Sequence, residues 1–247
     1  HYTGGMLSAL FRNGYTAGLM YFRGRSGEPN RLPRSYHSGE TGDLDIIVQQ
    51  LCRNYPEDKI AVIGYSLGGN VLLKWLGERG STAPVVTAVT VSVPFDLNSA
   101  ALNLERGLSR IYQRHLLKKL RESVVAKARQ HAVPFPVERL AELRTFRQFD
   151  NAITAPLHGF SGVDDYYEKS SSKQFLQHIA IPTLMLQSRD DPFLPETALP
   201  GEADLSNTVT LEISPRGGHV GYVAGRNPWR PAYWLEQRIL QHLAVFR

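Results

Sequence analysis

The sequence predicts an α/β fold in which helices cover both faces of a mostly parallel sheet. Two observations predict it: short runs rich in β-branched residues alternate with amphipathic segments, and glycine or proline follows most of the amphipathic segments. The predicted strands span residues 16–22, 59–64, 85–92, 183–187 and 209–213. The predicted helices span residues 6–13, 43–54, 67–78 and 233–243.

One long interruption of this alternation predicts a helical cap. No strand is predicted between residues 95 and 181, where several helical segments are separated by proline breaks. An insertion of this size, after a strand that ends near Ser92, is expected to lie over the sheet edge where ligands bind. We therefore expect a single domain over residues 1–247, with residues 96–180 as its cap or lid. Because no strand precedes the first helix, we expect this domain to be N-terminally incomplete, with strands missing from the sheet.

The composition is that of a globular enzyme. Hydrophobic residues make up 42% and charged residues 21% of the 247 residues, so the chain can fill a sizeable core. Its longest apolar runs fall short of the roughly 18 residues that indicate a membrane-spanning helix. The start of the chain lacks the pattern of a secretory signal, and a single cysteine, Cys52, cannot form an internal disulfide. These features favour a cytoplasmic location.

The net charge of +5 is concentrated in the predicted cap. Residues 105–147 hold eleven Lys or Arg against four Glu. A nucleic-acid groove would also need aromatic residues interleaved with the basic ones, and aromatic residues such as Tyr112 and Phe146 are few in this region. No nucleic-acid partner is therefore expected. Peripheral contact with anionic lipid, or with acidic substrates, fits the charge better than nucleic acid does, and a plain solvated helix face is the leading interpretation.

Gly64-Tyr65-Ser66-Leu67-Gly68 matches the GxSxG pattern of a nucleophile elbow. The predicted strand before it and the predicted helix after it are the setting that this motif requires. A sharp strand-to-helix turn crowds the backbone, so we expect glycine at both flanking positions to relieve contacts that a Cβ would create. Ser66 is the predicted nucleophile, and the Leu67 N–H is the predicted oxyanion-hole donor. The alternative is a glycine-rich turn with an idle serine.

A serine nucleophile needs an imidazole base and a carboxylate that orients it. Only His178 and His219 follow the cap, and His178 precedes the strand that should carry the acid, so His219 is the predicted base. Two adjacent carboxylates, Asp190 and Asp191, follow the predicted strand 183–187. A proline four residues after the acid, as is usual in such acid loops, favours Asp191. Asp190 stays as the alternative, with a structural role in the loop.

Other polar residues are assigned structural roles. The pair His158-Gly159 resembles a second oxyanion donor, but it lies in the cap, so we interpret it as structural. His37 and Glu40 lie in a polar loop, and Cys52 lies on a helix without a nearby metal-ligating residue. No metal and no cofactor site is predicted.

Taken in order, the motifs of this chain resemble the YheT-like group of the AB-hydrolase superfamily, the AB hydrolase 4 group, which is related to ABHD-type lipases and medium-chain acyl esterases. The resemblance covers essentially the whole chain. It implies an α/β-hydrolase fold and a carboxylic-ester hydrolase for short- or medium-chain acyl esters, without cofactors. The motifs that carry it are residues 22–30, 36–41, 64–70, 110–114, 190–193 and 217–221.

The resemblance also implies a departure at the oxyanion hole. Family members carry an HG-containing loop that supplies a second backbone donor, and it would lie ahead of the first residue here. Loss of one such donor costs about 10²- to 10³-fold in rate, so we expect the chain without this loop to be weakly active or inactive.

These residues predict a serine carboxylesterase or lipase that acts on a small acyl ester, with lipid esters included. Ser66 would form an acyl-enzyme with His219 as base, and water would release the acid. Two alternatives stay open: an alcohol acyltransferase on the same three residues, and a non-catalytic α/β-hydrolase scaffold that binds lipid or a partner.

Overall fold

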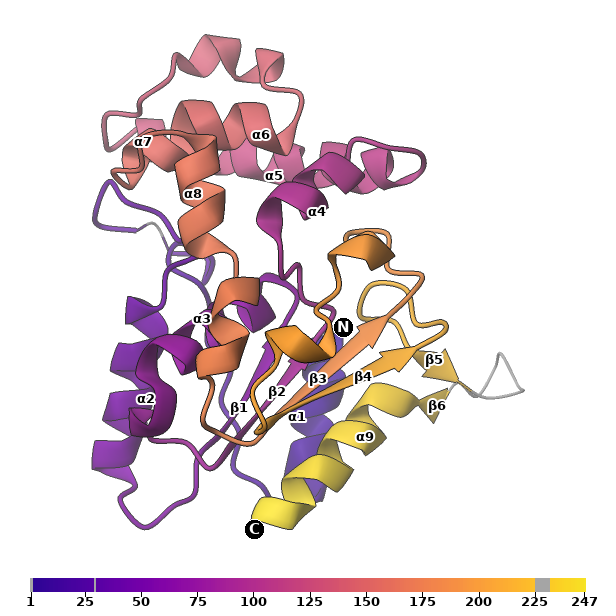
Figure 1. The fold of residues 1–247 in the computed structure, drawn as a ribbon. Coiled ribbons are helices and arrows are strands. Elements are labelled where there is room, and N and C mark those ends of the chain that lie inside the picture. Colours follow the sequence, from indigo (N-terminus) through magenta and orange to yellow (C-terminus); the bar gives the residue numbers. More distant parts are fainter. Residues whose placement is uncertain (1, 29, 225–231) are drawn as a thin grey trace.

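A four-stranded parallel sheet forms the centre of the protein. The computed structural model describes residues 2–28, 30–224 and 232–247 (Figure 1). The sheet has the order β1-β2-β3-β4, and every neighbouring pair is parallel. Its strands confirm four of the predicted ones: β1 (Ala61–Tyr65), β2 (Thr87–Val91), β3 (Thr183–Ser188) and β4 (Val209–Ser214). A short antiparallel pair, β5 (Val223–Ala224) and β6 (Ala232–Tyr233), lies outside it.

Helices cover both faces of the sheet, as predicted. One face packs against α2 (Gly42–Asn54) and α3 (Leu67–Arg79), and the other packs against α1 (Tyr2–Arg12) and α9 (Trp234–Leu243) (Figure 1). The central strands β2 and β3 are buried on both sides, and successive residues of β2 contribute to opposite faces: Ala88 packs towards α3 and Val89 towards α9. This double coverage explains why every residue of β2 and β3 is buried, rather than alternate residues only.

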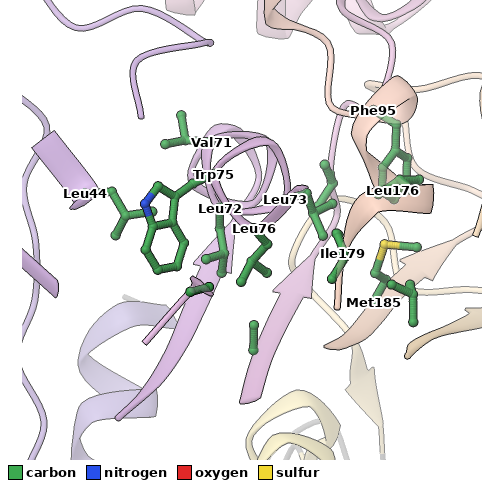
Figure 2. Packing of buried hydrophobic residues seen from close by; sticks show 14 of the residues in the cluster. Leu44, Val71, Leu72, Leu73, Trp75, Leu76, Phe95, Leu176, Ile179 and Met185 are labelled. Atoms are coloured by element: carbon green, nitrogen blue, oxygen red, sulfur yellow. The ribbon is translucent and has the colours of Figure 1, made fainter. Parts of the chain in front are cut away.

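The largest core cluster is organised around α3. Leu72, Leu73, Trp75 and Leu76 are almost fully buried. Figure 2 shows Trp75 beside Leu44 of α2, and Leu73 on the opposite side of α3, towards Ile179. Each such side chain contributes about 1.5–3 kcal/mol through burial. Trp75 also donates its indole N–H to Asp45 of α2 at 2.9 Å, so α2 is held to α3 by a hydrogen bond as well as by packing.

The predicted strand at residues 16–22 is wrong. This segment forms no strand ladder with any described residue, and β2 is the only described strand that pairs with β1. Leu19 and Tyr21 are 42% and 59% exposed, while Met20 and Phe22 pack against the core around α3. A strand requires hydrogen bonds from a neighbour, and local apolar content cannot supply that neighbour.

The described residues between β2 and β3 form helices joined by turns and loops, and no strand, in the region predicted as an inserted cap (residues 96–180). Figure 1 shows its helices above the carboxyl ends of the strands. They are α4 (Leu97–Asn103), α5 (Ser109–Ala128), α6 (Phe146–Phe149), α7 (Ala155–Leu157) and α8 (Val163–Ser170), with a π-helical turn at Asp150–Thr154 between α6 and α7.

A fully buried amide ties the cap to α3 and to the loop before α2. Asn70 donates from Nδ2 to the carbonyl oxygens of Ser38 at 2.9 Å and Ser170 at 2.8 Å. Its Oδ1 accepts the N–H of Ser172 at 3.0 Å. One side chain therefore joins α3, the loop before α2 and the end of α8, and satisfies three backbone groups that are removed from water.

The cap contains a buried carboxyl group in its π-helical turn. Asp150 accepts hydrogen bonds from Tyr167 at 2.7 Å and Thr154 at 2.6 Å. Burial raises the pKa of Asp150 to about 6, because desolvation penalises the charged carboxylate more than these two donors stabilise it.

A histidine pair joins the loop before α2 to the cap. The rings of His37 and His158 lie 4.6 Å apart. His158 contacts the carbonyl oxygen of Thr154 through Nδ1 at 2.8 Å and accepts the N–H of Ser35 at Nε2 at 3.1 Å. Burial, aided by the nearby charges of His158, Lys74 and Arg34, lowers the pKa of His37 to about 4.

These two shifts predict opposite pH dependences of stability. The pKa of Asp150 is raised from 3.8 to about 6, so its contribution is lost as pH rises from about 4 through 6. The pKa of His37 is lowered from 6.5 to about 4, so its contribution is lost as pH falls through that window. The difference in unfolding free energy between Asp150→Asn and wild type should therefore shift in favour of the variant as pH rises from 4 to 6. The same difference for His37→Gln should shift in favour of wild type. Urea unfolding at several pH values measures both differences, and parallel profiles would contradict the assignment.

Candidate active site

The predicted nucleophile lies at the turn between β1 and α3. Ser66 has φ 49° and ψ −119°, a conformation that non-glycine residues rarely adopt. Its N–H donates to the carbonyl of Val91 in β2 at 2.8 Å, and its carbonyl accepts the N–H of Gly69 at 2.9 Å. Leu67 is the first residue of α3, so its N–H belongs to the helix-terminal donors that have no partner within the helix.

The two glycines that flank Ser66 in the motif have different environments. A Cβ on Gly64 would lie 2.7 Å from the carbonyl oxygen of Gly68 and 2.8 Å from the Cα of Gly69, both backbone atoms. A Cβ on Gly68 would meet nothing within 4 Å. The expectation that both glycines relieve crowding is therefore confirmed for Gly64 and wrong for Gly68. The second crowded position is Gly69, where a Cβ would lie 2.5 Å from the Val93 side chain.

This difference predicts a matched pair of variants. Gly64→Ala should lower the free energy of unfolding by about 1–3 kcal/mol or more, because backbone atoms must move to admit the methyl group. Gly68→Ala should change it by less than about 0.5 kcal/mol. Chemical denaturation of both variants measures the difference, and equal losses would show that the close approach at Gly64 does not control the turn.

The structure brings Ser66, His219 and Asp191 together in one chain of hydrogen bonds. His219 Nε2 lies 2.9 Å from Ser66 Oγ, and its Nδ1 lies 3.0 and 3.1 Å from the two carboxylate oxygens of Asp191. Asp191 is buried, and it also accepts the N–H of Phe193 at 2.8 Å and an amide N–H of Gln187 at 3.2 Å. The carboxylate is thus fully hydrogen-bonded, as a buried charge requires.

The neighbouring carboxylate has different partners. Asp190 is exposed, and its Oδ1 accepts the backbone N–H groups of Gly217 and Gly218, both at 2.8 Å. The bond from Gly218, with help from Gly217, holds the pKa of Asp190 below its usual value. The two adjacent side chains therefore diverge: Asp191 contacts the imidazole, and Asp190 contacts the backbone of the loop that carries His219.

That loop is fastened to the ends of two strands. Ser92, just after β2, accepts the N–H of Val220 on its hydroxyl oxygen at 3.1 Å, and Ser188 of β3 donates to the carbonyl of Gly218 at 2.8 Å. Val220 and Tyr222 have positive φ angles of 58° and 42°. Strained non-glycine residues of this kind persist where surrounding contacts over-determine them, and they cluster at functional sites.

Two residues of the site were not assigned a role from the sequence. Gln187 is buried and bridges Asp191 to the N–H of Val93, which its Oε1 accepts at 2.9 Å. Phe193 stacks on the His219 ring, with centroids 3.9 Å apart and an interplanar angle of 16°. A lone amide near the end of an apolar strand was a usable signal for Gln187, whereas nothing in the local sequence indicates a ring-on-ring contact across 26 positions.

The cap also contacts the loop at residues 189–195, which carries both carboxylates and is called the acid loop after its predicted role. The carbonyl of Pro192 accepts hydrogen bonds from Asn103 Nδ2 and Ser109 Oγ, each at 2.8 Å. Tyr112 of α5 packs against Phe193, with ring centroids 5.4 Å apart. The start of α5 is therefore in contact with the residues that surround His219.

The other polar residues considered above lie away from this chain of hydrogen bonds. His158 and His37 join the loop before α2 to the cap, and the Cys52 thiol lies 3.6 Å from the carbonyl of Pro84. Within the described residues, no group of His, Cys, Asp or Glu side chains is arranged to hold a metal ion. None of the described helices is both long enough and apolar enough to cross a bilayer.

Comparison with known proteins defines the class. The family model described as the alpha/beta hydrolase fold matches residues 3–225. The chain belongs to this family and is an enzyme of the hydrolase class. It is 39% identical to the Escherichia coli protein named "Putative esterase YheT", over 99% of this chain and 72% of that protein.

Two further comparisons bear on length and fold. The chain is 33% identical to the Mus musculus phospholipase ABHD3 over 89% of its own length, and it spans about half of that relative, 54%. The Pyrococcus furiosus esterase Pf2001 superposes with a TM-score of 0.58 over 99% of this chain and 74% of that one. At 18% identity this likeness shows the fold alone.

Proposed function

We propose that this protein is a serine carboxylic-ester hydrolase in which Ser66 is the nucleophile, His219 the general base and Asp191 the orienting acid. The single observation that carries the proposal is the unbroken chain of hydrogen bonds from Ser66 Oγ through the His219 imidazole to the Asp191 carboxylate. It lies at the carboxyl ends of parallel strands, where α/β folds bind their ligands.

The geometry supports a two-step acyl transfer. Ser66 Oγ attacks the ester carbonyl while His219 Nε2 takes the hydroxyl proton, and the Leu67 N–H stabilises the oxyanion. His219 then returns the proton to the departing alcohol, which leaves an acyl-enzyme. Water attacks the acyl carbon with His219 again as base, and the acid leaves as Ser66 regains its proton. Asp191 stays ionised and holds the tautomer in which Nδ1 carries the hydrogen.

The names of the relatives support the proposed substrate class. We propose short- or medium-chain acyl esters, with lipid esters included, because the relatives carry the names esterase and phospholipase. The mechanism uses only side chains and water, so it requires no cofactor. We propose a cytoplasmic location, with peripheral contact between the basic cap and anionic lipid.

Removal of the nucleophile tests the proposal. In the full-length protein, Ser66→Ala should lower kcat for p-nitrophenyl butyrate by about 10⁴-fold or more, and a fluorophosphonate probe should no longer label the protein. Substantial activity in Ser66→Ala would overturn the assignment. Adding a small alcohol and separating the products tests the alternative, since accumulation of a new ester in place of the free acid would identify an acyltransferase.

The adjacent carboxylates supply a matched pair. Asp191→Asn should lower kcat by about 10⁴-fold, because the amide favours the wrong imidazole tautomer. Asp190→Asn retains Oδ1, the atom that accepts both loop N–H groups, so kcat should stay close to wild type. Steady-state kinetics of the two purified variants decide the assignment. The reverse order of effects would transfer the acid role to Asp190.

A further inference from the structure

The first turns of α5 expose an apolar face. Leu108, Ile111 and Tyr112 are 81%, 62% and 48% exposed. Leu108 caps the helix, and the spacing of three and four residues brings the other two to the same side. Large apolar side chains grouped at a helix terminus are costly in water and indicate a surface that contacts something apolar.

Basic residues extend this face along the helix. Between Arg106 and Arg121 the sequence contains six Lys or Arg and no Asp or Glu. Five of these residues are exposed, and within the described part of the chain none of the five forms an ion pair; they are Arg106, Arg110, Arg114, Lys118 and Lys119. Unpaired cations beside exposed apolar groups match a surface that offers anionic groups above an apolar layer.

Another exposed apolar face shows that the charge is specific to α5. Helix α2 exposes Ile46, Ile47 and Leu51, which are 62%, 38% and 38% exposed, and the spacing of four residues places Ile47 and Leu51 on one face. Its first turn carries Asp43 and Asp45, so the charge around this face includes carboxylates. Of these two helices, only α5 combines an apolar patch with an all-basic flank.

We propose that this face of α5, defined by Leu108, Ile111, Tyr112, Lys118 and Lys119, docks on the surface of an anionic phospholipid bilayer. The apolar side chains enter the acyl-chain boundary, and the long Lys side chains reach the phosphates. Tyr112 packs on Phe193, which stacks on His219, so the docked face lies beside the candidate site. The delivery of a lipid ester from this surface to Ser66 rests on the proposed hydrolase activity, whereas the docking itself deepens the proposed lipid contact and does not require that activity.

Vesicle binding by the full-length Ser66→Ala protein tests docking independently of catalysis. We expect co-sedimentation with vesicles of phosphatidylglycerol and phosphatidylcholine, and much weaker binding to phosphatidylcholine alone or in high salt. Leu108→Ser with Ile111→Ser should weaken binding by about tenfold per side chain, and Lys118→Gln with Lys119→Gln by about fivefold per charge.

Matched variants on other surfaces serve as controls. Ile46→Ser with Leu51→Ser on α2 removes two exposed apolar groups, and Arg12→Gln with Arg53→Gln removes two exposed cations; both should bind vesicles as well as the parent does. Absence of a preference for anionic vesicles, or equal losses in the controls, would overturn the proposal. So would light scattering that shows a dimer dissociated by the Leu108 and Ile111 changes, since the face would then join two copies of the chain.

An activity measurement separates docking from catalysis. With Ser66 present, Leu108→Ser with Ile111→Ser should retain kcat/KM for soluble p-nitrophenyl butyrate and lose it for an ester embedded in anionic vesicles. If neither ester is hydrolysed by the parent, the proposed function fails while the binding result stands. Equal rates of parent and variant on the embedded ester would overturn delivery from the docked face.

Discussion

The strained turn at Ser66 is the constraint on which the site and the largest core cluster both depend. Its left-handed φ of 49° is retained because the flanking backbone is fixed on both sides, by the bond to β2 and by the first turn of α3. The same turn starts the helix whose residues from Asn70 to Leu76 are buried without interruption. The position of the hydroxyl and the packing of α3 against the sheet are therefore set together, and a Cβ at Gly64 would disturb both.

Two buried side-chain amides connect this turn and the site to the surrounding elements. Gln187 joins the end of β3 to the backbone after β2 and donates to Asp191, so the carboxylate is positioned by the sheet itself. On the other side of Ser66, Asn70 joins α3 to the loop before α2 and to the end of α8. Removal of either amide should lower the free energy of unfolding, because it would leave buried backbone or carboxylate groups without a hydrogen-bond partner.

The features that were predictable from the sequence are those set by local patterns. Strand, elbow and helix around Ser66 follow one another within twenty residues, and chain order then selects His219 and the pair of carboxylates. The strand at 16–22 could not be judged this way, because its existence depends on a neighbour rather than on its own residues. The environment of Gly68 likewise depends on the direction of one Cα–Cβ vector, which no spacing rule reports. Phe193 lies beside His219 only because the acid loop and the histidine loop meet over the sheet edge.

The contacts of the cap limit how it can move. At its start, Asn103 and Ser109 hold the carbonyl of Pro192 in the acid loop, and at its end Asn70 holds the backbone around Ser170. Lifting the cap as a rigid lid would break bonds at both ends, each worth about 1 kcal/mol net, and would pull directly on the loop that positions Asp191. Motion that leaves the acid loop intact is therefore confined to the helices between these anchors. The first turns of α5 lie at the edge of the cap that is hydrogen-bonded to the acid loop. A substrate that enters beside them therefore need not move this edge or disturb the hydrogen bonds between Ser66, His219 and Asp191.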